Sequence, residues 1–376
     1  MKLKQFIQQE TVLTAAAVLA VVSAFFVPLD VQYLGYIDLR TLAILFSLMT
    51  VMAGLRRQGF FDDLGRALLS RTHSTFQLTL VLVGLCFFGS MFITNDVSLL
   101  TFVPFTFVVL SRLGADVRRA LLVPVVCMQT IAANLGSMLT PIGNPQNLYL
   151  YGKSGMSIGG FVLLMLPYTL VSLLLLLAWA ALVCRKASAA LSVDELVSSS
   201  ASQGDQKIIL LYLVLFAVCL LSVIRVLPYG IAFAAVLVCV LFADPHTLRA
   251  VDYSLLLTFV AFFIFIGNLG RIPAFSGWLQ EFLTGREVLV AVLASQVTSN
   301  VPAALLLSGF TAETQALIIG TNLGGLGTLI ASMASLISYR QIARELPQGK
   351  KRYFGLFTLS NLIFLAILLG VWFLLR

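Results

Sequence analysis

Long uninterrupted runs of apolar residues constrain this chain more than any other feature of its sequence. Several runs, such as residues 163–181, extend for about 15–25 residues, which is long enough to cross a bilayer as a helix. Hydrophobic residues make up 60% of the 376 residues and charged residues only 11%, against about 25% charged residues in a soluble domain. The runs lack the alternation of a membrane β-barrel strand. The sequence therefore predicts an all-α, multi-pass protein of the inner or plasma membrane, surrounded by lipid.

Nine segments are predicted to be membrane spans on this basis. The first follows Lys2 and Lys4 and resembles a signal peptide, but it has no clear small-residue cleavage site, so we interpret it as an uncleaved span. The predicted spans are residues 11–28, 37–55, 118–150, 160–184, 208–226, 229–243, 252–269, 312–339 and 353–375.

The positive charge of the chain is explained by its topology. The net charge is +8, but the arginines and lysines cluster in loops, as the positive-inside rule expects of cytoplasmic loops. With a cytoplasmic N-terminus and an outside C-terminus, 18 of the 24 Lys and Arg residues are cytoplasmic. No nucleic-acid motif is present, so no nucleic-acid partner is expected. The six basic residues then placed outside are Arg40, Lys153, Arg225, Arg271, Arg286 and Arg376.

The chain contains two related halves, residues 1–184 and 208–376, joined by a Ser- and Ala-rich segment predicted to be a flexible cytoplasmic linker (185–207). Ile37–Leu42 matches Val251–Leu256, and each match leads into an apolar run and then an amphipathic stretch. Five predicted spans separate the two starting points. An odd number makes the two copies cross the membrane in opposite senses, so the repeats are predicted to have inverted topology.

Each half also contains an apolar segment with a polar interruption, at 77–111 and 287–310. In the second segment the apolar stretches 287–298 and 302–310 hold 12 and 9 residues, whereas a span needs about 20. We therefore predict a re-entrant helical hairpin there and, by symmetry, another at 77–111. Irregular backbone at that depth is tolerated only when it is buried in protein or lines a wet cavity, so the two tips are expected to meet near the midplane.

The hairpin tips carry hydroxyl, amide and carboxylate groups, from Thr94, Asn95 and Asp96 in the first and from Ser299 and Asn300 in the second. Free carbonyls at the end of one half-helix suit a cation such as Na⁺, and free N–H groups at the start of the next suit an anion. Helix capping also explains these residue types. Unpaired polar groups in lipid cost several kcal/mol, however, and a duplicated polar tip therefore favours a binding site.

Asp96 is the only acidic residue deep in an apolar segment. A carboxylate within the membrane is by default a functional candidate, because its burial is costly. A capping carboxylate with permanent hydrogen bonds is the simpler structural explanation. We predict instead that Asp96 couples transport to a cation, by carrying a proton, by ligating sodium, or by each in turn.

A second pair of polar interruptions lies in the helices predicted at 118–150 and 312–339. Glycine permits unusual backbone angles and proline cannot donate to a helix ladder, so unwinding there exposes the backbone to a ligand. A simple kink explains one such break, whereas two matched breaks favour a site. The candidate residues are Asn134, Gly136, Thr140, Pro141, Gly143 and Asn144 in the first break, and Asn322, Gly324 and Thr328 in the second.

These motifs resemble those of the ion transporter superfamily, which holds arsenite permeases, NhaD-type sodium/proton antiporters, citrate symporters and divalent-anion/sodium symporters. The motifs are Thr94–Asp96, Thr140–Asn147 and Ser299–Asn300, and the resemblance covers nearly the whole chain. It implies a homodimer in which a scaffold domain supports a transport domain that moves like an elevator. Divalent-anion symporters typically have Ser-Asn-Thr at both tips, so Asp96 and Val301 in the third positions favour the arsenite-permease or antiporter side.

Carried over residue by residue, the resemblance implies that Thr94–Asn95 and Ser299–Asn300 bind substrate and cation. It implies that Asn134–Gly143 and Asn322–Thr328 complete the cation sites.

The sequence thus predicts a secondary active transporter of a small anion, a carboxylate or oxyanion such as citrate, a dicarboxylate or arsenite, coupled to H⁺ or Na⁺ and using no other cofactor. A Na⁺/H⁺ antiporter with Asp96 as the shared site is the alternative, and a channel is a more remote one. No enzyme is expected, because His73 and His246 lie in predicted loops and no metalloprotease, paired-carboxylate or nucleotide-binding motif is present. The predicted site contains no Arg or Lys, so a neutral weak acid fits as well.

Overall fold

The computed structural model describes residues 10–70, 72–185 and 204–376, and these ranges contain helices and no strand. The described residues include six helices long and apolar enough to cross a membrane, which confirms the predicted all-α membrane fold. They are α4 (Leu39–Arg57), α8 (Ala115–Gly136), α10 (Ile158–Cys184), α12 (Gln206–Val223), α14 (Tyr253–Gly270) and α20 (Lys350–Leu375).

Shorter helices connect and surround the six candidate spans. The first predicted span is one of them, since its helix ends at Ala24 instead of continuing to residue 28. The shorter elements are α2 (Thr11–Ala24), α3 (Gln32–Tyr36), α5 (Phe60–Leu69), α13 (Tyr229–Ala243), η2 (Pro245–Ala250), α15 (Pro273–Leu283) and η3 (Pro347–Gly349). Most of the predicted linker (185–207) lies outside the described residues, which resume at residue 204.

The segments predicted to be hairpins and broken helices are each divided into two or three helical elements. The two predicted hairpins consist of α6 (Thr75–Gly89) with α7 (Asn95–Ser111), and of α16 (Glu287–Thr298) with α17 (Asn300–Leu307). The two predicted broken helices consist of α8 with η1 (Ser137–Leu139) and α9 (Pro145–Ser154), and of α18 (Thr314–Leu323) with α19 (Met333–Glu345). The helix interruptions therefore fall at or next to the polar residues that the sequence singles out.

Equivalent helices of the two halves begin with the same cap. The Asp38 carboxylate accepts a hydrogen bond from the Thr41 N–H at 3.0 Å at the start of α4, and the Asp252 carboxylate accepts one from the Leu255 N–H at 3.0 Å at the start of α14. Aspartate is a preferred N-cap because its oxygen satisfies a backbone donor that has no partner within the helix. The caps explain why the two aspartates occupy matching positions in the sequence.

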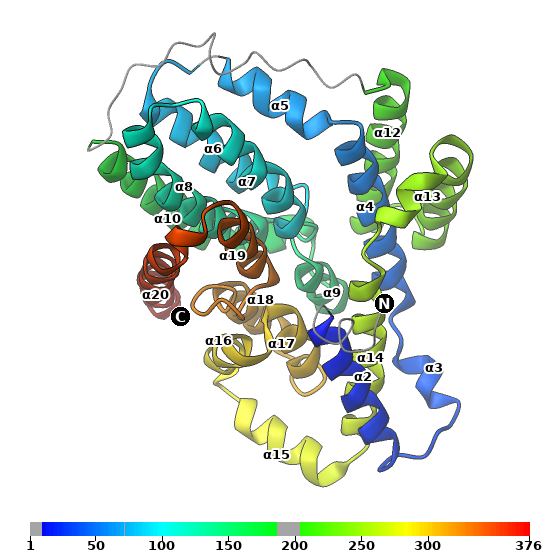
Figure 1. Ribbon diagram of the computed structural model, residues 1–376. Coiled ribbons are helices and arrows are strands. Elements are labelled where there is room, and N and C mark those ends of the chain that lie inside the picture. The colour runs from blue at the N-terminus through cyan, green and yellow to red at the C-terminus, as the bar shows by residue number, and fades with distance from the viewer. Residues whose placement is uncertain (1–9, 71, 186–203) are drawn as a thin grey trace.

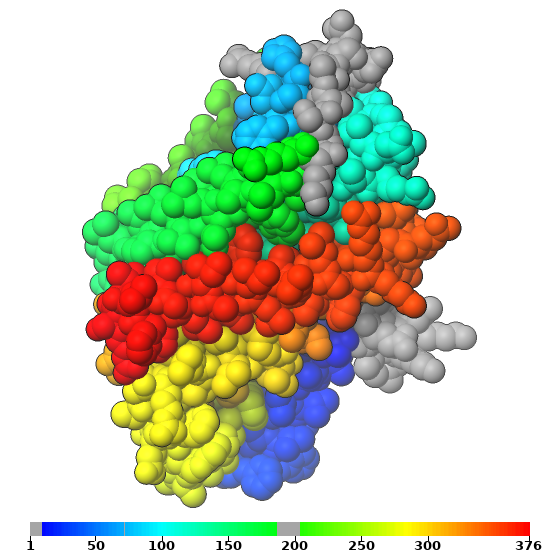
Figure 2. All heavy atoms as spheres, turned by 90° about the vertical axis from the view of Figure 1, so that its left-hand side faces the viewer, coloured from blue at the N-terminus to red at the C-terminus, as the bar shows by residue number. Residues whose placement is uncertain are grey.

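The helices pack in two groups (Figure 1). In one group, α2 packs against α14, and α4 packs against α12 and α13. In the other, α8 is buried along its full apolar length and contacts α6, α7, α10 and α20. Figure 2 shows α20 running alongside α10 across one face of the molecule. The amphipathic helices that follow α4 and α14, which are α5 and α15, lie at opposite ends of the molecule in Figure 1.

Candidate functional site

Asn134, at the end of α8, connects the two halves of the chain. Its side-chain oxygen accepts hydrogen bonds from the Asn95 amide at 3.0 Å and from the Ser332 hydroxyl at 2.9 Å. Its own amide donates to the Ser335 hydroxyl at 3.4 Å. All four side chains are buried. One amide thus joins the first hairpin to both broken helices.

The equivalent asparagine of the second half makes the equivalent contact. Asn322 donates its side-chain amide to the Asn147 side-chain oxygen at 2.6 Å. In the repeat predicted from the sequence, Asn147 corresponds to Ser335, which is the partner of Asn134. The contact from Asn134 to the second break is therefore matched by one from Asn322 to the first.

Each hairpin tip is also fixed to the break of its own half through the backbone. The Asn95 N–H donates to the Gly143 carbonyl at 3.2 Å, and the Asn300 N–H donates to the Ala331 carbonyl at 3.0 Å. Gly143 and Ala331 are equivalent positions.

Ser299, at the second tip, has a left-handed backbone with φ of 77°, which is an unfavourable conformation for a residue with a β-carbon.

Small residues allow the hairpins to lie directly against the broken helices. A β-carbon on Gly136 would lie 2.0 Å from the Phe87 carbonyl oxygen and 2.7 Å from the Ser90 hydroxyl, and one on Gly324 would lie 2.6 Å from the Ser295 hydroxyl. Ser90 and Ser295 are equivalent positions in the two hairpins. The two glycines therefore serve close helix packing at matched places.

Asp96 and Thr94 line a cavity of about 160 Å³ between the first hairpin and α4. The buried Asp96 Oδ1 atom has no hydrogen-bond partner among the described residues. The cavity is also lined by Arg56 from the last turn of α4 and by Asp252 from the start of α14. These four polar residues come from both packing groups, so the cavity lies where the groups meet.

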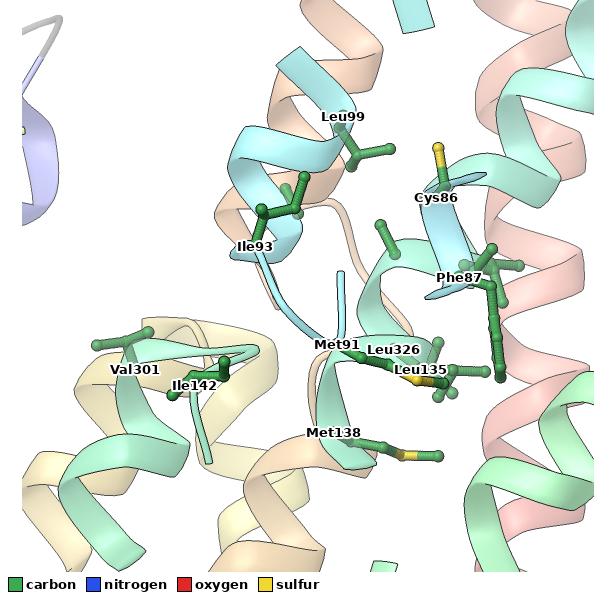
Figure 3. Close-up of a cluster of buried hydrophobic side chains, with 14 of the residues drawn as sticks. Cys86, Phe87, Met91, Ile93, Leu99, Leu135, Met138, Ile142, Val301 and Leu326 are labelled. Atoms are coloured by element: carbon green, nitrogen blue, oxygen red, sulfur yellow. The ribbon is translucent and has the colours of Figure 1, made fainter. Parts of the chain in front are cut away.

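Apolar side chains surround the tips and breaks (Figure 3). Ile93 and Leu99 belong to the first hairpin, Leu135 lies at the end of α8, Met138 lies in η1, and Val301 follows the second tip. Such surroundings exclude water, which strengthens each polar interaction and makes an unpaired charge costly.

The first break contains buried amide groups without partners. Asn144 Oδ1 and both side-chain polar atoms of Gln146 form no hydrogen bond with a described residue, and neither does Asn322 Oδ1. All three side chains are at most 2% exposed. Amide oxygens are hard ligands of the kind that alkali and alkaline-earth cations prefer. No group of three His, Cys, Asp or Glu side chains gathers as a metal site within the described ranges.

The remaining predicted residues differ in their surroundings. Thr140 donates its hydroxyl to the Met91 carbonyl oxygen at 2.5 Å, which ties the first break to the loop before the tip, and Pro141 is buried in the same break. Thr328 lies away from the Asn134 network, because it is exposed and bonds to Gln296 on α16. No hydrogen bond between described residues joins the two tips directly.

Several residues of this region are absent from the sequence-based site, among them Arg56, Asn147 and Ser335. Arg56 looked like one of the loop arginines that follow a span, and only the structure places it on the Asp96 cavity. Asn147 and Ser335 could have been predicted from the sequence, because each ends one of the two stretches that align with each other after the breaks.

Comparison with known proteins shows which protein family the chain matches. Residues 6–316 match the model of a family described as citrate transporter. The inner membrane protein YbiR of Escherichia coli K12 is 32% identical over 84% of this chain and 84% of its own length. An uncharacterized transporter of Methanocaldococcus jannaschii is 30% identical over 83% of each chain. A shorter match, 34% identical over 36% of this chain and 27% of the relative, is to the rice silicon efflux transporter LSI3.

Proposed function

The chain belongs to the citrate transporter family and is a multi-pass membrane transporter, and we propose that it moves a small anion by secondary active transport, coupled to a proton or a sodium ion. The observation that carries this proposal is the Asp96 carboxylate, which lines a cavity beside a hairpin tip and has a buried oxygen without a partner. A carboxylate in that position can accept a proton or ligate sodium.

The unpartnered amide oxygens of Asn144, Gln146 and Asn322 support a cation site near the first break. Burying a polar atom without a partner costs about 1–3 kcal/mol, and a bound cation would remove that cost. In this proposal Thr94, Asn95 and Asp96 hold the cation at one tip, and Ser299 and Asn300 at the other.

The packing supports movement of the hairpins as a unit, as an elevator mechanism requires. The first tip bonds to Gly143 and Asn134, and the second to Ala331, all in the broken helices. The matched contacts of the two halves, and the placement of α5 and α15 at opposite ends of Figure 1, support inverted repeats. The homodimer and a cytoplasmic N-terminus with an outside C-terminus are part of the same proposal.

A sodium/proton antiporter is the second candidate, because it needs only the Asp96 carboxylate as a shared cation site. Purified protein in liposomes separates the two functions. Internal pH and sodium are recorded while each gradient is imposed, first without added anion and then with carboxylates and oxyanions. We expect ion movement only with a suitable anion, whereas sodium-driven proton movement without one would establish the antiporter.

The variant Asp96→Asn tests the coupling residue in the same assay. We expect it to abolish cation-coupled transport, because an amide neither takes a proton nor offers a negative charge. The matched control is Asp116→Asn, which alters an exposed aspartate in the first turn of α8, away from the cavity. Coupled transport by Asp96→Asn at the wild-type rate would refute the role of Asp96.

A further inference from the structure

Among the described residues, the Asp96 cavity is lined by one cationic side chain, and that side chain is in no ion pair with another described residue. Arg56 and Arg57 are neighbours in the last turn of α4, but they differ in their partners. Arg57 is 2.9 Å from the Asp244 carboxylate and also donates to Thr247. None of the ion pairs between described residues includes Arg56, which lines the cavity and is half-buried.

A half-buried guanidinium beside an apolar cavity is well suited to an anion. Its planar fork forms two parallel hydrogen bonds to a carboxylate or an oxyanion, and it keeps its charge at every physiological pH. The other charged groups that the described residues place on the cavity are Asp96 and Asp252, so this described lining carries one negative charge more than it carries positive charges.

The charges next to the cavity leave this balance unchanged. Asp252 also lines an adjoining cavity, where Glu10 and Arg340 are the further charged residues within the described ranges. The negative charge of Glu10 and the positive charge of Arg340 cancel in that cavity. An anion approaching Arg56 therefore meets a site with an excess of one carboxylate, and like charges at short range oppose its binding.

We infer that Arg56 binds the acidic head group of the transported anion, and that the anion binds tightly only after a cation has neutralised Asp96. The inference rests on the proposed function, because it assumes that an anion is the substrate. It also specifies the substrate class: one guanidinium serves one acidic head group, so a small anion with a single carboxylate or oxyanion group fits this cavity better than a polycarboxylate such as citrate.

Uptake into liposomes tests the role of Arg56 and uses lactate, phosphate and citrate as probes. We expect a single-headed anion to be transported, with a half-saturating concentration that rises at least about tenfold in Arg56→Gln, since hydrogen bonds to charged groups contribute about 1.5–3 kcal/mol. Arg56→Lys should restore part of the affinity, because it keeps the charge without the fork. Arg57→Gln, the matched control, should leave the half-saturating concentration within about twofold of wild type.

A binding measurement tests the order of events, because it does not require transport. Isothermal titration of the purified protein should give an affinity for the transported anion that rises with sodium concentration or with acidity. In Asp96→Asn the affinity should be as high as in cation-loaded wild type and should not respond to the cation. An affinity that still depends on the cation in Asp96→Asn would overturn the order of binding.

The remaining outcomes separate this inference from the proposed function. If wild type transports none of the probes and none binds, the proposed function fails. If wild type transports an anion and both Arg56→Gln and Arg56→Lys bind it with wild-type affinity, only the role of Arg56 fails. Preferred transport of citrate would overturn the inference that the substrate carries a single acidic head group. Thermal unfolding of each variant identifies any loss of affinity that reflects misfolding.

Discussion

At the scale of single residues, the side-chain oxygen of Asn134 accepts two buried hydrogen bonds, one from the first hairpin and one from the second broken helix. Replacing Asn134 with Ala leaves the Asn95 amide and the Ser332 hydroxyl without their acceptor. A buried donor without a partner costs about 1–3 kcal/mol. We therefore expect Asn134→Ala to lower the free energy of unfolding by at least that amount, measured by chemical denaturation in a mild detergent, and to reduce transport.

The control at this scale is an amide outside the network. Gln280 is exposed on α15 and bonds only within its own helix, so Gln280→Ala should change stability by no more than about 0.5 kcal/mol. Equal stability of the Asn134→Ala and Gln280→Ala variants would show that the Asn134 hydrogen bonds contribute nothing.

At the scale of helices, the contact between the first hairpin and α8 depends on the absence of one side chain. A β-carbon at Gly136 would lie 2.0 Å from the backbone oxygen of Phe87, and 2.7 Å from the Ser90 hydroxyl. The backbone oxygen cannot rotate away, so the hairpin must move. Overpacking of this kind costs about 1–3 kcal/mol or more. We expect Gly136→Ala to lower the unfolding temperature and to impair transport.

Gly84, in α6 of the same hairpin, supplies the matched substitution. Its β-carbon would meet only the Phe88 ring at 3.9 Å, an ordinary contact, and alanine is a better helix former than glycine by about 1 kcal/mol. Gly84→Ala should therefore be as stable as wild type or more stable. A Gly136→Ala protein that unfolds at the wild-type temperature would disprove the close packing.

At the scale of the whole molecule, the proposed inverted repeats would place the ends of the two broken helices on opposite sides of the membrane. Lys153 lies near the end of α9 and Arg344 near the end of α19, and both are exposed. In a chain without its native cysteines, we expect a membrane-impermeant maleimide applied from outside to label Lys153→Cys but not Arg344→Cys. Membrane disruption should make both sites reactive. Labelling of both sites in intact cells would exclude the inverted arrangement.

The sequence alone determined the helical elements and the positions of their interruptions. An apolar run of sufficient length favours a helix within the membrane, because a helix satisfies its own backbone hydrogen bonds, and Asn, Gly and Pro act on the backbone locally. The helices and their breaks could therefore be predicted from residues close together in the chain. The first span was placed less well, because its helix ends at Ala24 although the apolar run continues.

Only the tertiary structure decided which polar groups meet. Asn134 bonds to Ser332 and Asn322 bonds to Asn147 across the two halves, whereas Thr328 lies apart from this network despite its matched position. Arg56 reaches the Asp96 cavity although it reads as a loop arginine. Such contacts join residues far apart in the chain, and they depend on how helices pack in three dimensions. Local sequence patterns predict where helices form, but they do not predict how those helices pack against one another.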